Sequence, residues 1–311
     1  MVSADWETFA WNGIVFSKPY TWEISKEEFT SKVYYVVFED IKMRRLELKA
    51  ETIPFDKAPE AKDIIDKFID TVKEKFSDIK VISKSDINLL NHKAYEAIMR
   101  TKDYCLECIG WYCDDSERAF LLNFIYKTEE STKAKDIIFK IIKSFKCHLE
   151  GEMYPWYFQG IFLMLPKEYK PIEKKTTTGL SYLKFYHKET VILLAYNCMA
   201  SVILEEEDIE TWFKKRVFKQ CFKKYGKISD LKKRDLIKLN THDVNIFSYE
   251  IKVPFSPRKR KCYLSLWVCD QNNRLMCFTV VSKESIRVKE KEVKEMERLF
   301  IDSLKSLKCH Q

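Results

Sequence analysis

Glycine is scarce in this sequence, with six among 311 residues. Loops that wrap phosphate groups in their backbone need several glycines in close succession. The patterns G-x-G-x-x-G and G-x-x-x-x-G-K-[ST] do not occur, and neither does the G-x-S-x-G of α/β-hydrolases. These absences disfavour nucleotide enzymes and serine hydrolases. Because no other catalytic motif is evident, we lean towards a protein that is not an enzyme.

Long apolar runs are missing as well. No stretch approaches the roughly 18 consecutive apolar residues that a membrane-spanning helix needs. The opening residues, MVSADWE, are polar and acidic and do not form the apolar core of a signal peptide. We therefore expect a cytoplasmic protein with no membrane span.

What the sequence does contain is charge, apolar residues and cysteine. Charged residues make up 33% of the chain, rich in lysine and glutamate and with a net charge of +8. That mixture is typical of the surfaces of hyperthermophile proteins, so we expect a thermophilic source. The ten cysteines would stay reduced in most cytoplasms, but intracellular disulfides persist in hyperthermophiles. Hydrophobic residues (46%) suffice for two cores of about 150 residues each.

A sequence pattern that occurs twice divides the chain into two halves. The pattern W-x-C-D-x-x-x-R occurs at residues 111–118 and again at 267–274. Each copy precedes a helical pattern that ends in Ser-Phe/Leu-Lys-Cys-His, at 144–148 and 306–310. The offset between the copies grows along the chain, as loop insertions on a common fold produce. We predict a tandem duplication with domains at 1–150 and 151–311, docked through a shared interface.

Hydrophobic periodicity predicts the same elements in both halves. Strands are expected at 13–22, 32–39, 43–51, 80–83, 93–100, 106–113, 119–127, 160–166, 181–187, 190–197, 261–269 and 275–281. Amphipathic helices are expected at 58–76, 131–147, 207–225 and 288–308. Short turns between successive strands imply antiparallel pairing. The predicted fold class is α+β, with two tandem α/β sandwich domains, each a mostly antiparallel sheet flanked by two amphipathic helices.

This order of elements is similar to a known fold. With its opening strand, proline turn and following aromatic residue (Pro19 to Trp22, Pro166 to Tyr169), each repeat resembles the PsbP/Mog1-like α/β sandwich. The resemblance covers both repeats and implies that fold. It carries over no functional residue, because no functional motif of the family matches and its members bind quite different partners.

Cysteine and histidine supply the main candidate site. Two histidines and two cysteines of the first repeat have equivalents in the second: His92 with His242, Cys113 with Cys269, Cys147 with Cys309, and His148 with His310. The other six cysteines have no such equivalent. Residues that resist the divergence of two copies are expected to share a structural or chemical constraint.

Three interpretations of this set stay open. The first is one disulfide per repeat, Cys113–Cys147 and Cys269–Cys309, each stabilising by about 3.5–4 kcal/mol through loop closure. The second is a Cys₂His₂ zinc site in each repeat, made of all eight residues, although their spacing lacks the usual C-x₂₋₄-C knuckle. The third is a set of buried thiols and core histidines that share no role.

Basic residues cluster in the second repeat. Their positions are Lys232, Lys233, Arg234, Arg258, Lys259, Arg260 and Lys261. Such a surface fits an anion or nucleic-acid partner. The alternative is a solvated helix face and a charged hairpin tip, which the interleaved acidic residues favour.

These observations lead to a function hypothesis with two alternatives. The leading one is a non-enzymatic binding or scaffold protein without a cofactor, whose duplicated domains present a surface to an unknown protein or small molecule. The first alternative is a zinc-dependent or thiol-dependent protein that uses the repeated Cys/His set. The second is an anion or nucleic-acid binder that uses the basic surface of the second repeat.

Overall fold

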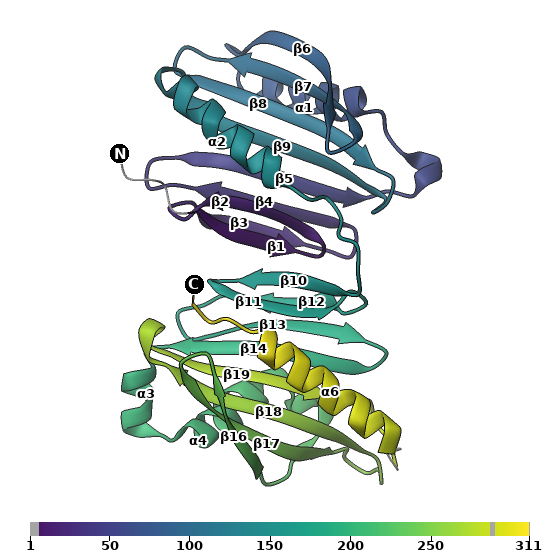
Figure 1. Cartoon of the computed structure of the whole chain (residues 1–311), viewed down its shortest axis with the longest axis vertical. Helices are drawn as coiled ribbons and strands as arrows, with labels where there is room; N and C mark the ends of the chain where they lie inside the picture. The colour runs from purple at the N-terminus through teal and green to yellow at the C-terminus, as the bar shows by residue number, and fades with distance from the viewer. Residues whose placement is uncertain (1–5, 287–289, 311) are drawn as a thin grey trace. The chain divides into compact units, whose positions relative to one another are not determined.

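The protein consists of two compact units, residues 1–150 and 151–311. The computed structural model describes residues 6–286 and 290–310. Each unit has its own sheet and its own helices (Figure 1). Within the described ranges, no helix combines the length and the apolar character that crossing a membrane requires.

The first unit is built on a seven-stranded antiparallel sheet. In spatial order its strands are β3 (Glu23–Phe29), β4 (Val33–Glu39), β5 (Arg44–Thr52), β9 (Arg118–Lys127), β8 (Tyr104–Cys113), β7 (His92–Arg100) and β6 (Lys80–Leu89). A separate hairpin joins β1 (Trp6–Trp11) to β2 (Ile14–Pro19). The helices are α1 (Ala61–Lys75) and α2 (Ser131–Ser144), with short 3₁₀ turns at Phe55–Lys57 and Thr128–Glu130.

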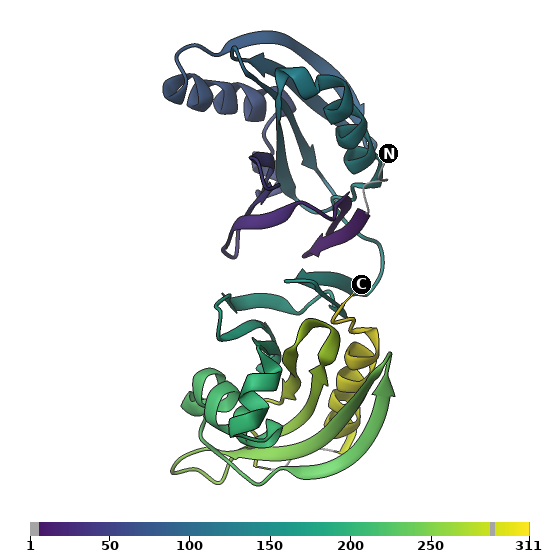
Figure 2. The same ribbon diagram turned by 90° about the vertical axis from the view of Figure 1, so that its left-hand side faces the viewer.

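The two helices of the first unit cover opposite faces of its sheet (Figure 2). Successive residues of a strand point to opposite faces, and Gly110 and Trp111 of β8 show the consequence. A side chain at Gly110 would lie 3.1 Å from Ile65 of α1. Trp111 instead stacks on Phe120 and meets Phe145, which follows α2, with ring centroids 4.8 and 5.5 Å away. The sheet therefore separates two apolar layers, one under each helix.

The second unit repeats this plan with additions. Its sheet runs β12 (Lys170–Lys175), β13 (Leu180–His187), β14 (Thr190–Cys198), β19 (Arg274–Val281), β18 (Lys259–Cys269), β17 (His242–Lys252) and β15 (Lys227–Ile228), and β16 (Lys232–Leu239) also pairs with β17. A hairpin joins β10 (Met153–Phe158) to β11 (Ile161–Pro166). The helices are α3 (Ala200–Glu206), α4 (Ile209–Trp212), a π-helical turn (Phe213–Phe218), α5 (Lys219–Cys221) and α6 (Glu290–Ser306), with 3₁₀ turns at Lys223–Tyr225 and Asp270–Asn272.

Opposite faces of the second sheet are covered in the same way (Figure 2). Phe300 of α6 stacks on Tyr263 and Phe278, with ring centroids 5.6 and 5.8 Å away. On the other face, Phe213 meets Tyr249 at 5.7 Å. The predicted fold class, α+β with two mostly antiparallel sheets, is confirmed, and both sheets have their central strands in equivalent order.

Several predicted elements have different bounds in the structure. The helix expected at 207–225 starts earlier, at Ala200, and breaks at Asp208, whose side chain accepts a hydrogen bond from the Thr211 amide at 2.8 Å and so caps a new helix. The helix expected to run to Cys147 ends at Ser144. Phe76, the last residue of the helix expected at 58–76, is 53% exposed because α1 ends before it. Val288, where the last helix was expected to begin, lies outside the described residues.

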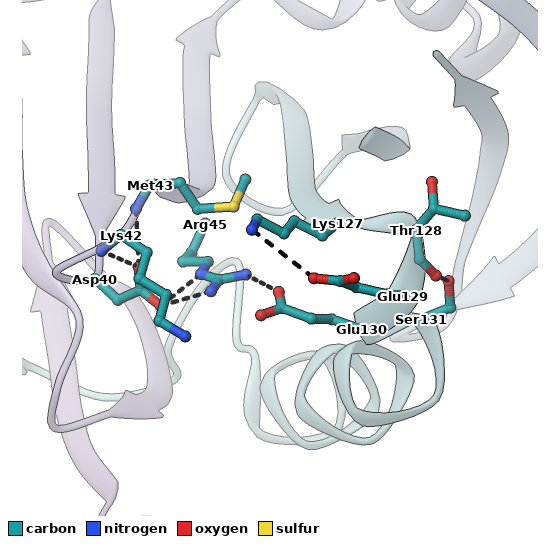
Figure 3. A network of polar contacts seen from close by, with 9 residues as sticks. All are labelled: Asp40, Lys42, Met43, Arg45, Lys127, Thr128, Glu129, Glu130 and Ser131. Atoms are coloured by element: carbon teal, nitrogen blue, oxygen red, sulfur yellow. Dashed lines mark hydrogen bonds and ion pairs between the residues drawn. The ribbon is translucent and has the colours of Figure 1, made fainter. Parts of the chain in front are cut away.

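A network of ion pairs joins the β4–β5 turn to the start of α2 (Figure 3). Arg45 of β5 is only 11% exposed, and its Nε and Nη2 both lie 2.7 Å from Oδ2 of Asp40. Its Nη1 donates to Oε2 of Glu130 at 2.7 Å. The backbone amides of Lys42 and Met43 donate to the other Asp40 oxygen at 2.8 and 2.9 Å. Arg45 thus holds a loop against a helix through two carboxylates.

Replacing Arg45 by methionine is expected to cost about 1–3 kcal/mol at pH 7, because two half-buried carboxylates lose a charged partner. Burial raises the pKa of Asp40, but hydrogen bonds from Arg45 and the two backbone amides outweigh it and leave the pKa lowered. The same guanidinium lowers the pKa of Glu130. A depressed folded-state pKa stabilises the protein above the unfolded pKa, and this contribution is lost as the pH falls below about 4.

Urea unfolding of both proteins at pH 7 and pH 3.5 measures this dependence. The gap between wild type and Arg45→Met should narrow on acidification. Arg44→Met is the matched control, because Arg44 is 56% exposed and its ion pairs are screened by water. An unchanged gap between wild type and Arg45→Met at the two pH values would contradict the assignment.

Candidate metal centres in the two repeats

The segment after each closing helix is extended and bonded to the N-terminal hairpin of its unit. In the first unit, Val15 of β2 and Lys146 exchange backbone hydrogen bonds of 3.0 and 2.7 Å. In the second unit, Phe162 of β11 and Lys308 do the same, both at 2.8 Å. These bridges hold the following residue, Cys147 or Cys309, with its side chain buried.

Four ligand-type side chains meet in the first repeat. His92 begins β7 and Cys113 ends β8, so antiparallel pairing brings them to the same end of the sheet. The Cys147 sulfur lies 3.2 Å from Nε2 of His92, 3.5 Å from the Cys113 sulfur and 3.3 Å from Nδ1 of His148. The Cys113 sulfur is also 3.3 Å from Nδ1 of His148. Two parts of the fold therefore supply two ligand atoms each.

The second repeat assembles the same four residue types. The Cys309 sulfur lies 3.1 Å from Nε2 of His242 and 3.5 Å from Nδ1 of His310. The Cys269 sulfur is 3.5 Å from that same Nδ1. In each cluster, all four ligand atoms lie within 4.8 Å of one another.

These separations fit one tetrahedral metal ion per cluster. Zinc bonds of about 2.3 Å to sulfur and about 2.05 Å to nitrogen place neighbouring ligand atoms about 3.4–3.8 Å apart. The distances of 3.1 to 3.5 Å are within a few tenths of an ångström of those values. Small side-chain rotations would admit the ion.

Side chains around the first cluster orient its ligands. Nε2 of His148 lies 3.4 Å from a carboxylate oxygen of Asp115, a contact that orients the ring and leaves Nδ1 available to bind a metal ion. Arg118 donates to the Cys147 carbonyl at 2.6 Å. A hydrogen bond from Cys147 lowers the pKa of Cys113. The Cys113 sulfur and burial raise the pKa of Cys147, and the indole of Trp111 opposes them.

The second cluster is supported differently at one position. Asn272 donates to the Cys309 carbonyl at 2.9 Å. In the first repeat the equivalent carbonyl, that of Cys147, accepts from Arg118 instead. Arg274, the equivalent of Arg118, donates to the carbonyl of Gln159 at 2.9 Å. Burial lowers the pKa of His242, which favours the neutral imidazole that a metal binds.

The structure thus brings together all eight residues of the predicted zinc sets. The two cysteine pairs predicted to form disulfides are free thiols in this structure. The Cys113 and Cys147 sulfurs are 3.5 Å apart, well beyond the roughly 2.05 Å of a disulfide bond. The disulfides stay a prediction. What sequence reasoning missed is Asp115, because a turn aspartate next to a zinc set has no distinctive spacing.

The basic residues of the second repeat differ in their exposure. Lys232, Lys233 and Arg234 are exposed on the edge strand β16, not on a helix or hairpin tip as expected. Arg258 is exposed, Lys259 pairs with Glu250 at 2.7 Å and Lys261 is half-buried. Arg260 corrects the prediction most clearly. It is 9% exposed and therefore belongs to the interior.

Arg260→Ala is expected to destabilise the second unit by about 1–3 kcal/mol, since Arg260 donates to the Ser282 carbonyl at 2.9 Å and to Glu284 at 3.0 Å. Lys233→Ala should change the free energy of unfolding by less than about 0.5 kcal/mol, because Lys233 is exposed. Thermal unfolding of the two variants distinguishes the roles. If Arg260→Ala and Lys233→Ala lose the same amount of stability, the interior role assigned to Arg260 is wrong.

Comparison with known proteins identifies the fold of the first repeat. Residues 2–147 match the model of a family described as PsbP-like protein. The first repeat is similar to this PsbP-like family over that range. The match ends at Cys147, so the PsbP-like region includes three of the four first-cluster residues. The resemblance inferred from the order of elements is confirmed, and no curated protein sequence matches the chain.

Two solved structures align with nearly the whole chain, but with low sequence identity and low TM-scores. The apo structure of the immunity protein TplEi of the T6SS from Pseudomonas aeruginosa is 8% identical, with a TM-score of 0.35, covering 99% of this chain and 100% of that one. A chain of the Tle4–Tli4 complex is 7% identical, with a TM-score of 0.36 and full coverage of both chains. At these scores the likeness carries no argument about function.

Proposed function

We propose that this protein is a non-enzymatic binding protein whose two PsbP-like repeats are each held together by one zinc ion. His92, Cys113, Cys147 and His148 bind the first ion, and the equivalent residues of the second repeat bind the other. The observation that carries the proposal is the convergence of the same four residue types in both repeats. The partner of such a protein is another protein or a small molecule, bound away from the zinc.

The contacts of Cys147 favour a metal ion over simple hydrogen bonding. Its sulfur lies 3.2 to 3.5 Å from three other ligand atoms. A thiol has a single proton and can serve one acceptor well. An ion at the centre of the four atoms would satisfy all of these contacts at once, and two thiolates with two neutral imidazoles suit zinc in particular.

A structural role follows from the number of ligands. Catalytic zinc sites keep one position open for water, whereas structural sites are closed by four protein ligands. Each cluster supplies four, so we assign the ions to holding the end of the β7–β8 pair, or β17–β18, against the segment after the closing helix.

Metal analysis of the protein purified without chelators tests the proposal. We expect two zinc ions per chain, one in Cys147→Ser or Cys309→Ser, and none in the double variant. Cys198→Ser is the matched control and should keep two, because Cys198 belongs to neither cluster. Protein that holds no zinc after reconstitution in a reducing buffer would refute the proposed function.

A further inference from the structure

The two sulfurs of the first cluster are in direct contact. The 3.5 Å between Cys113 and Cys147 exceeds a disulfide bond by only about 1.5 Å, a movement that side-chain rotation can supply. Residues 113 and 147 belong to the turn-proximal end of β8 and to the segment after α2. A bond between the sulfurs would therefore tie the same two segments as the zinc ion does.

The histidines of the first cluster are more exposed at one position than those of the second. The side chain of His148 is 32% exposed, and its carboxylate partner Asp115 is 65% exposed. His92 is half-buried, whereas the equivalent His242 is only 7% exposed. The cysteines of both clusters are buried, with Cys113 and Cys269 at 0% and Cys147 and Cys309 at 2% exposure. A small polar oxidant must therefore pass the histidines, and the first cluster offers the more open path because His92 is less buried than His242.

We propose that the first-repeat cluster is a peroxide-sensitive switch, in which oxidation joins Cys113 to Cys147 and releases the zinc ion, while the second-repeat cluster keeps its ion. The inference rests on the proposed function, because the switch exists only if the thiolates hold zinc. It assigns the two repeats different roles: the first responds to oxidant and the second stays a structural tie.

The chemistry balances with hydrogen peroxide as the oxidant. One thiolate attacks a peroxide oxygen, the O–O bond breaks, and the sulfur becomes a sulfenic acid while hydroxide leaves. The second thiolate attacks that sulfur, the S–S bond forms, and a second hydroxide leaves. Two protons from solvent convert both hydroxides to water. The sulfur pair loses two electrons, the peroxide gains two, and zinc leaves as Zn²⁺ because neither sulfur is any longer a thiolate.

Oxidation replaces the zinc ion by a disulfide, and the disulfide joins the same two segments of the first repeat. The disulfide would keep β8 tied to the segment after α2. His92 and His148, however, would no longer be joined through a shared zinc ion. The His148 ring would then keep its contact with Asp115 but lose its tie to Cys113 and Cys147 through the ion. Reduction by a dithiol in the presence of zinc should restore the original site.

The test treats the full chain, loaded with two zinc ions, with a small molar excess of hydrogen peroxide. A chromogenic zinc indicator follows release, and peptide mapping after alkylation identifies disulfides. We expect one zinc ion per chain to be released in a first phase, together with a Cys113–Cys147 disulfide. The second ion should leave at least tenfold more slowly. Dithiothreitol and added zinc should return the stoichiometry to two.

Three variants make the outcome decisive. Cys198→Ser should release zinc as wild type does, because that thiol belongs to neither cluster. Cys309→Ser, with the first site alone, should keep the fast phase, and Cys147→Ser should lack it. Zinc that leaves without a Cys113–Cys147 bond, or leaves the second site first, overturns the switch but not the zinc sites. Protein that never held zinc overturns both.

Discussion

Removing zinc from the Cys309→Ser variant, which keeps the first site alone, is expected to lower the local stability of the first repeat by about 4 kcal/mol. The loss is measured relative to a sample of the same variant in which free zinc is about a thousandfold above its dissociation constant. The physical reason is that the ion binds only where His92, Cys113, Cys147 and His148 converge, and an unfolded chain does not hold them together. Hydrogen exchange of the β7–β9 amides measures the loss.

The matched comparison is the double variant Cys147→Ser, Cys309→Ser, which has neither site. Its amide exchange should not depend on zinc. The wild type should show a zinc-dependent loss in both repeats, at β7–β9 and at β17–β19. If the exchange of the Cys309→Ser variant is the same with zinc as with a strong chelator, the ion does not stabilise the fold.

Truncating Trp111 is expected to have an effect of similar size. Trp111 is fully buried, and its ring stacks on Phe120 with centroids 4.8 Å apart and an interplanar angle of 9°. Phe145 meets it edge-on at 5.5 Å. Trp111→Ala removes the largest side chain of this layer and leaves a cavity, which costs about 3–5 kcal/mol in comparable cores. Urea unfolding monitored by circular dichroism reports the change.

Two variants frame that result. Trp111→Phe keeps an aromatic ring and should lose less than half as much stability. Phe139→Ala is the surface control, because Phe139 lies on α2 but is 65% exposed, and its free energy of unfolding should change by less than about 0.5 kcal/mol. A loss below 1 kcal/mol in Trp111→Ala would show that this aromatic layer does not anchor the first repeat.

Sequence periodicity located several central strands well, but it missed β17 inside the second sheet and located the edges poorly. Strands β4, β8 and β9 lie close to their predicted bounds, because buried positions of a sheet select apolar and β-branched residues. The edge strands β3 and β12, with sequences EISKEEF and KPIEKK, were not predicted. Both faces of these strands carry charged residues, so they show no apolar alternation. Edge strands often carry such charge, which protects them from pairing with other chains.

The sequence predicted which residues belong to the candidate site, but not how they are arranged in space. Comparing the two repeats singled out His92, Cys113 and Cys147, because their residue types persist while neighbouring positions differ. The spacing between them, however, matches no zinc motif. Antiparallel register places His92 beside the end of β8, and the bridge from Lys146 to Val15 adds Cys147 from the far end of the repeat. Neither placement can be read from local sequence.

The sequence alone therefore determined the α+β class and the eight cysteines and histidines that the two halves share, and it predicted a duplication. These follow from periodicity and internal repetition, which depend on residues near one another in the chain. Only the tertiary structure decided that each set converges on one point, that Arg260 is buried and that Asp115 supports His148. Those outcomes depend on strand register and on how the segment after a helix docks, since contacts between residues distant in sequence form only in the folded chain.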